Sequence, residues 1–196
     1  MRNQIRIVAA AMCAGLLLGA VTTASAASVG VSFAGRDPGF PLDADASAGV
    51  VAQSLWNNLA GEPFSSTSYS LLANTGEFTD VKLVYAANDS WHSDGPSVTA
   101  NDKLMKGIQK MNPDPDLAPI NNTDRMIFTI TNLPAGTFNV LVYLANNGLG
   151  GEVSVNAGGA ITYYVSQEAV FTGTFVRSTD TTPGSWPVGA NYAQFD

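Results

Sequence analysis

Alternating hydrophobic and polar side chains mark residues 125–147 as two β-strands joined by a turn. The first strand alternates apolar residues with threonine over 128–131, and the second is apolar on both faces over 137–144. A strand that is apolar on both faces usually lies in the interior of a sheet. Residues 133–136 supply the proline and glycine of a connecting turn. The pattern therefore predicts a central antiparallel hairpin.

The same alternation predicts further short strands along the chain. A turn containing Asn and Gly at 73–76 should join two of them into a second hairpin. In the later strand of this hairpin, we expect Val81, Leu83 and Tyr85 to share one face. The additional predicted strands cover residues 28–33, 66–72, 78–86, 152–156, 161–165, 171–177 and 192–195.

One helix is predicted, at residues 101–111. Asn101 is a suitable N-cap, Pro113 ends the pattern, and apolar side chains recur at i, i+4 and i+7 from Leu104. Its other side is most simply a solvated face, formed by Lys103, Lys106 and Lys110. Many short strands with one helix and no βαβ alternation favour an all-β fold, an antiparallel β-sandwich or jelly roll with one short helix.

Residues 1–26 have the pattern of a signal peptide. Two arginines precede an uncharged apolar run at 7–18, and small residues at 24–26 provide a cleavage site. Because the apolar run is short for a membrane span, we expect cleavage, export and a mature protein with no membrane span. Residues 27–196 then form a single domain. Since the strand pattern at 192–195 meets the end of the sequence, we expect this domain to be truncated there.

Composition narrows the chemistry of the exported part. The only cysteine, Cys13, lies in the signal segment, so the mature protein is expected to contain no disulfide or thiolate site. Without Arg2 and Arg6, seven basic residues face sixteen acidic ones, which gives a formal charge of −9 after residue 26. Nucleic acid is therefore not an expected partner, because binding it depends on Lys and Arg neutralising phosphates.

Five segments, taken in order, resemble a family of secreted bacterial domains of verrucomicrobial and planctomycete type. They are residues 29–35 (VGVSFAG), 47–61 (SAGVVAQSLWNNLAG), 90–95 (SWHSDG), 101–107 (NDKLMKG) and 130–143 (ITNLPAGTFNVLVY). Such domains often occur in proteins that carry a C-terminal PEP-type sorting anchor. The resemblance implies a galactose-binding-like β-sandwich at the cell surface or in the extracellular matrix. It implies fold and location rather than a defined activity.

Candidate chemistry points to carbohydrate. A sugar is held by an aromatic face against its CH groups and by polar side chains on its hydroxyls. Residues 56–58 and residues 91–94 supply this combination of side chains. The second segment lies in a predicted polar loop at 88–96. The candidate ligand-binding residues are Trp56, Asn57, Asn58, Trp91, His92 and Asp94. The apolar residues before Trp56 favour a core position for it, whereas Trp91 is balanced between the two interpretations. Trp186 is a third exposed candidate.

Catalysis and metal binding have weaker support. The only histidine, His92, lies between Trp91 and Ser93 and is interpreted as a surface imidazole rather than a base or zinc ligand. Pairs of carboxylates occur at Asp43/Asp45, Asp89/Asp94 and Asp114/Asp116. They are typical of solvated loops, with the paired carboxylates of a glycoside hydrolase and Ca²⁺ coordination as the alternatives. We therefore expect a non-catalytic module that binds a glycan or extracellular polysaccharide, with no required cofactor. The alternative is a purely structural or adhesion domain.

Overall fold

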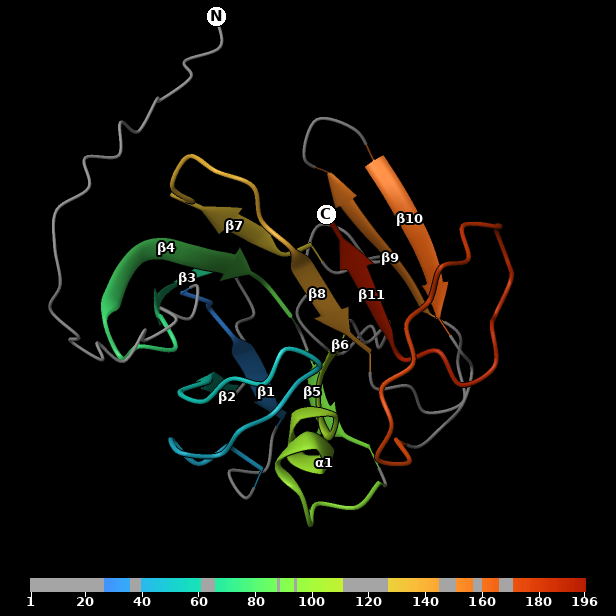
Figure 1. The fold of residues 1–196 in the computed structure, drawn as a ribbon, viewed down its shortest axis with the longest axis horizontal. Helices are drawn as coiled ribbons and strands as arrows, with labels where there is room; N and C mark the ends of the chain where they lie inside the picture. The colour runs from blue at the N-terminus through green and yellow to red at the C-terminus, as the bar shows by residue number, and fades with distance from the viewer. Residues whose placement is uncertain are drawn as a thin grey trace, which may run out of the picture.

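The computed structural model describes residues 27–35, 40–60, 66–87, 89–93, 95–110, 127–144, 151–156, 160–165 and 171–196. Within these ranges the protein consists of strands and one short helix, which confirms the all-β prediction (Figure 1). The predicted signal peptide and the prolines after the predicted helix lie outside the described residues. The first elements are β1 (Val31–Gly35), β2 (Asn57–Ala60), β3 (Thr67–Leu72), β4 (Phe78–Tyr85), β5 (Asp89–His92) and α1 (Ala100–Leu104).

The second half of the described chain continues in strands. They are β6 (Gly107–Lys110), β7 (Thr129–Thr131), β8 (Val140–Tyr143), β9 (Gly151–Asn156), β10 (Ala160–Val165) and β11 (Tyr192–Phe195). No helix in the described ranges has the length and apolar character needed to cross a membrane.

Antiparallel pairing dominates the described strands. It joins β3, β4 and β7 into one sheet in that order, and it forms the pairs β5–β6, β8–β11 and β9–β10. The exception is β1–β2, which is parallel, with Val31 opposite Asn57. In Figure 1 the β3–β4–β7 sheet lies on one side and the β8–β11 and β9–β10 pairs on the other. The strand β2 was not predicted, because its sequence, NNLA, is short and half polar.

The predicted second hairpin is confirmed. Residues of β3 and β4 pair across a turn in which the N–H of Ala73 donates to the carbonyl of Glu77 at 2.9 Å. Gly76 adopts a φ of 84°, which a side chain rarely tolerates. The side chains of Val81, Leu83 and Tyr85 are all buried on one face, as the alternation predicted.

The predicted central hairpin is wrong. Both strands exist, but β7 pairs with β4, placing Ile130 opposite Leu83, and β8 pairs with β11, placing Val142 opposite Ala193. After β7 the chain turns at Asn132, whose φ is 60°, and crosses to the other side of the molecule. Alternation in the sequence predicts where a strand forms. Which strand it pairs with depends on the side-chain packing and burial that each pairing gives. Within the described residues β8 is therefore one strand of a pair rather than a central strand.

The helix is shorter than predicted and begins earlier. Its N-cap is Thr99 rather than Asn101, and a capping box links Thr99 to Asp102, whose carboxylate accepts from the Thr99 N–H at 2.8 Å. The helix ends at Leu104, and the chain returns as β6 along β5. The strand pairing of β6 therefore replaces the last turns of the predicted helix.

Two further predictions need correction. Residues 88–96, predicted as a polar loop, contain β5. Residues 171–177 form no strand, and their only ladder contact is an isolated parallel bridge between Arg177 and Tyr192. The strands β9, β10 and β11 lie where alternation predicted them.

Two buried clusters hold these elements together. In the first, residues of β3 and β4 are covered by side chains of β1 and β2, among them Phe33 and Leu59. The second joins the loop before β2, helix α1 and strand β8 through Leu42, Leu104 and Tyr143. Burying a large apolar side chain contributes about 1.5–3 kcal/mol, so these clusters are a main source of stability.

Candidate functional site

The segment from β5 to β6 positions two of the predicted site residues. The N–H of Ser93, just after β5, donates to the carbonyl of Lys106 at 2.8 Å. The Lys106 ammonium group donates to the carbonyl of Gly95 at 2.5 Å. Lys106 is buried, and its hydrogen bond attaches the loop before α1. This corrects the prediction that Lys106 lies on a solvated helix face. These two hydrogen bonds connect Lys106 to the chain that directly follows Trp91 and His92. We call this hydrogen-bonded segment the frame.

Three rings gather on this frame. Trp91 and His92 stack with ring centroids 5.1 Å apart and an interplanar angle of 11°. The ring of Phe40 lies 5.2 Å from that of His92, and the Lys106 nitrogen lies 4.7 Å from the Phe40 centroid. Trp91 is 43% exposed, whereas Phe40 and His92 are half-buried. We call Phe40, Trp91 and His92 the aromatic platform.

The backbone of β1 lies in close contact with the backbone of β5, which carries Trp91 and His92, and with that of β6. A Cβ atom on Gly35 would lie 2.4 Å from the carbonyl oxygen of Trp91, and one on Gly107 would lie 1.4 Å from that of Phe33. Only glycine allows β1 to approach β5 and β6 so closely. The backbone of Trp91 is thus packed directly against β1.

Trp56 belongs to the second buried cluster rather than to the platform. Its ring meets the ring of Tyr143 edge-on, with centroids 6.5 Å apart, and its indole N–H donates to the carbonyl of Gln53 at 2.9 Å. The side chain is half-buried, which agrees with the interpretation of Trp56 as a core residue.

The amides of Asn57 and Asn58 bond to the backbone. Asn57 donates to the carbonyls of Gly30 and Leu72 and accepts from the N–H of Leu72, all within 2.9 Å. Asn58 both donates to the carbonyl of Leu42 and accepts from its N–H. These amides already have protein partners, so they organise the loops around β2.

The carboxylates do not assemble into a metal centre in the described ranges, where no group of three or more His, Cys, Asp or Glu side chains could hold an ion. Asp43 pairs with Lys103 at 3.3 Å. Asp89 is buried in β5. Asp94, Asp114 and Asp116 lie outside the described residues, so the Asp89/Asp94 and Asp114/Asp116 pairs have no geometry here.

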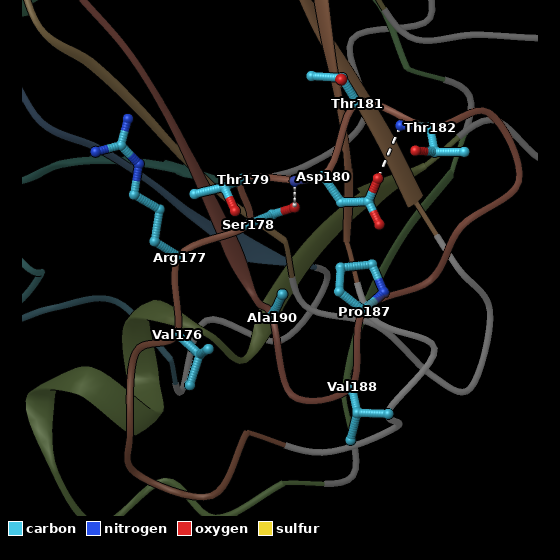
Figure 2. Close-up of a pocket in the computed structure, with 10 residues that line it drawn as sticks. All are labelled: Val176, Arg177, Ser178, Thr179, Asp180, Thr181, Thr182, Pro187, Val188 and Ala190. Atoms are coloured by element: carbon cyan, nitrogen blue, oxygen red, sulfur yellow. Dashed lines mark hydrogen bonds between the residues drawn. The ribbon is translucent and has the colours of Figure 1, made fainter.

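A hollow that the sequence did not predict lies between residues 176–182 and 187–190 (Figure 2). One of its lining side chains is Asp180, whose carboxylate accepts from the hydroxyl of Ser185 and from the N–H of Thr182. These hydrogen bonds hold the pKa of Asp180 below its usual value. The sequence signal was the polar run Ser-Thr-Asp-Thr-Thr at 178–182, which alone is typical of any loop.

Trp186, predicted as exposed, is half-buried near this hollow. Its ring meets that of Tyr164 edge-on, with centroids 5.8 Å apart. Trp91 is therefore the most exposed of the three tryptophans.

No protein-family model matches the chain, and neither the curated proteins nor the solved structures give a match.

Proposed function

We propose that the protein is a secreted, non-catalytic module that binds carbohydrate at the cell surface or in the extracellular matrix. The fold proposed for it is a galactose-binding-like β-sandwich. The observation that carries the proposal is the aromatic platform, where Trp91 is 43% exposed and rests on a fixed frame. An indole face of this kind packs against the CH groups of a sugar ring.

The surroundings of His92 fit a binding role. The His92 ring is stacked on Trp91 and packed beside Phe40, and its Nδ1 atom lies 3.3 Å from the carbonyl oxygen of Ser93. In this environment the imidazole extends the platform.

A polysaccharide retention assay tests the proposal. Native gels containing a neutral β-glucan, a xylan or a galactomannan should slow the protein, and Trp91→Ala should restore its mobility. Val98→Ala is the matched control, because Val98 is an apolar residue that is 87% exposed and is not one of the platform rings. Equal retention of the wild-type protein and Trp91→Ala would overturn the proposed role of the platform. Running the gels with and without Ca²⁺ tests whether binding needs the ion.

The alternative is a structural or adhesion domain, and one observation favours it. Five large apolar side chains in residues 127–138, which include β7 and the chain that leads to β8, are exposed by 39–57%. They are Ile127, Phe128, Ile130, Leu133 and Phe138. Exposed apolar groups of this size often mark a contact with another macromolecule. A folded protein that no polysaccharide retains would favour this alternative.

A further inference from the structure

The hollow around Asp180 is large enough to admit a small molecule. Its volume is ≈ 540 Å³, which is within the range of small-molecule pockets. The hollow opens widely to solvent and is formed by a single loop that runs from residue 176 to residue 190 (Figure 2).

The backbone around Asp180 is anchored to β10. The carbonyl of Asp180 accepts from the N–H of Tyr164 at 2.9 Å. Its own N–H donates to the hydroxyl of Ser178 at 3.3 Å, and that buried hydroxyl donates to the carbonyl of Tyr164. Asp180 is therefore held in place before any ligand arrives, which reduces the entropy cost of binding.

The carboxylate itself is oriented and ionised. The Thr182 N–H donates to one oxygen at 2.8 Å, and the Ser185 hydroxyl donates to the other. Each carboxylate oxygen has a second lone pair, so Asp180 can still accept hydrogen bonds from a ligand.

The basic side chain that lines the hollow is directed elsewhere. Arg177 donates to the carbonyl of Gln194 at 3.2 Å and lies 3.8 Å from the carboxylate of Asp196. In Figure 2 its side chain points away from Asp180. Among the described residues, no Lys or Arg pairs with Asp180, so none of them neutralises its charge.

Apolar surface borders this acceptor. Pro187 and Val188 also line the hollow, and Val188 is 86% exposed. A pyranose ring offers hydroxyl groups that donate hydrogen bonds to a carboxylate. It also offers CH groups that pack on an apolar surface. A simple cation needs no apolar neighbour.

We propose that the Asp180 hollow is a second carbohydrate subsite that takes a neutral sugar. Asp180 accepts hydrogen bonds from the sugar hydroxyls, and Pro187 with Val188 contacts its CH face. The sugar is neutral because a carboxylate repels an acidic sugar and the whole chain has a formal charge of −7. This inference rests on the proposed carbohydrate-binding function.

Retention in native gels that contain the polysaccharide bound by the wild-type protein tests the subsite. Asp180→Asn should weaken binding by about tenfold or more, since a charge-assisted hydrogen bond to the sugar is lost. Asp80→Asn is the matched control, because Asp80 is an exposed aspartate of β4 that does not line the hollow. It should bind within about twofold of the wild-type protein. Equal thermal unfolding of both variants excludes misfolding as the cause.

The outcomes separate the subsite from the platform. Binding that survives Asp180→Asn but not Trp91→Ala overturns the subsite and leaves the platform standing. Equal losses in Asp180→Asn and Asp80→Asn also overturn it, because the loss then follows the net charge of the protein rather than the Asp180 carboxylate. If the wild-type protein binds spermidine through Asp180 but no polysaccharide, the hollow is a cation site and the sugar proposal fails. If the wild-type protein binds no polysaccharide at all, the proposed function fails and the subsite fails with it.

Discussion

The hydroxyl of Tyr143 in β8 accepts a hydrogen bond from the backbone N–H of Val50 at 2.9 Å, although 93 residues separate the two along the chain. The Tyr143 ring also packs against Trp56 and lies 5.2 Å from the ring of Phe175. Tyr143 therefore joins the β8–β11 pair to the loop that precedes β2, which makes it a connection between the two sides of the fold.

Replacing Tyr143 should separate the hydrogen bond from the ring packing. Tyr143→Phe removes only the acceptor, and water can reach the exposed Val50, so we expect a loss of about 0.5–1.5 kcal/mol in unfolding free energy. Tyr143→Ala also removes the ring contacts and should cost about 2–4 kcal/mol. Urea denaturation measures both values. Equal losses in the two variants would contradict the role of the ring.

Glycine 107 should tolerate no side chain. A Cβ atom there would meet the Phe33 carbonyl oxygen at 1.4 Å, so Gly107→Ala must separate β1 from β6 and should cost about 3 kcal/mol or more. Gly136→Ala is the matched control, because its nearest neighbour would be the Phe138 ring at 3.8 Å. Thermal unfolding of the two variants checks this contrast. A Gly107→Ala protein as stable as Gly136→Ala would contradict a close approach of β1 to β6.

Asn57 should contribute more to stability than Asn58. Asn57→Ala removes three hydrogen bonds to Gly30 and Leu72 at partly buried positions and should cost about 2–4 kcal/mol. Asn58→Ala removes two bonds to Leu42 from an exposed side chain and should cost about 0.5–1.5 kcal/mol. Chemical denaturation compares the two. The reverse order would mean that these amides do not organise the loops around β2.

Tyr85 should make the protein sensitive to alkali. Burial raises the pKa of Tyr85 above its usual value of 10.0, and the neighbouring Tyr69 raises it further. The folded protein therefore favours the neutral phenol. The resulting stability is complete below pH 10 and is lost as the pH rises from 10 towards the raised pKa.

The variant Tyr85→Phe tests this dependence. It cannot ionise, so its unfolding free energy should fall less steeply than that of the wild-type protein above pH 10. At pH 7 the substitution should change the unfolding free energy by less than about 1.5 kcal/mol. Identical alkaline slopes for the two proteins would contradict a raised pKa at Tyr85.

Alternation in the sequence predicted strands better than it predicted their partners. The hairpin of β3 and β4 could be predicted because its turn at 73–76 is local and carries Asn and Gly. The partners of Ile130 and Val142 could not, because each strand is apolar enough to pair with several others, and the choice depends on which surfaces remain to be buried.

The helix illustrates how a local signal was overridden. Leu104 and the lysines after it have helical spacing, yet the capping box at Thr99 starts the helix earlier and pairing with β5 ends it at Leu104. Lys106 is consequently buried, and its ammonium group donates a hydrogen bond to the carbonyl of Gly95. Its spacing in the sequence gave no sign of this contact, which depends on how the chain folds back.

The candidate site was predicted in part. Trp91 and His92 were identified from their chemistry, and the structure brings them together, with Phe40 as a third ring. Phe40 could not be predicted, because it lies in a Gly-rich and Pro-rich loop far from Trp91 along the chain. Asp180 was missed because an aspartate among serines and threonines is ordinary in a loop until its fixed geometry is known.

The central claim is that the exposed face of Trp91 contacts carbohydrate, and fluorescence tests it most directly. The double variant Trp56→Phe/Trp186→Phe leaves Trp91 as the only one of the three tryptophans. Adding a polysaccharide that retains the protein should shift the Trp91 emission to the blue and protect it from acrylamide quenching, because the sugar excludes water from the ring. Unchanged emission and quenching at saturating polysaccharide would contradict the claim.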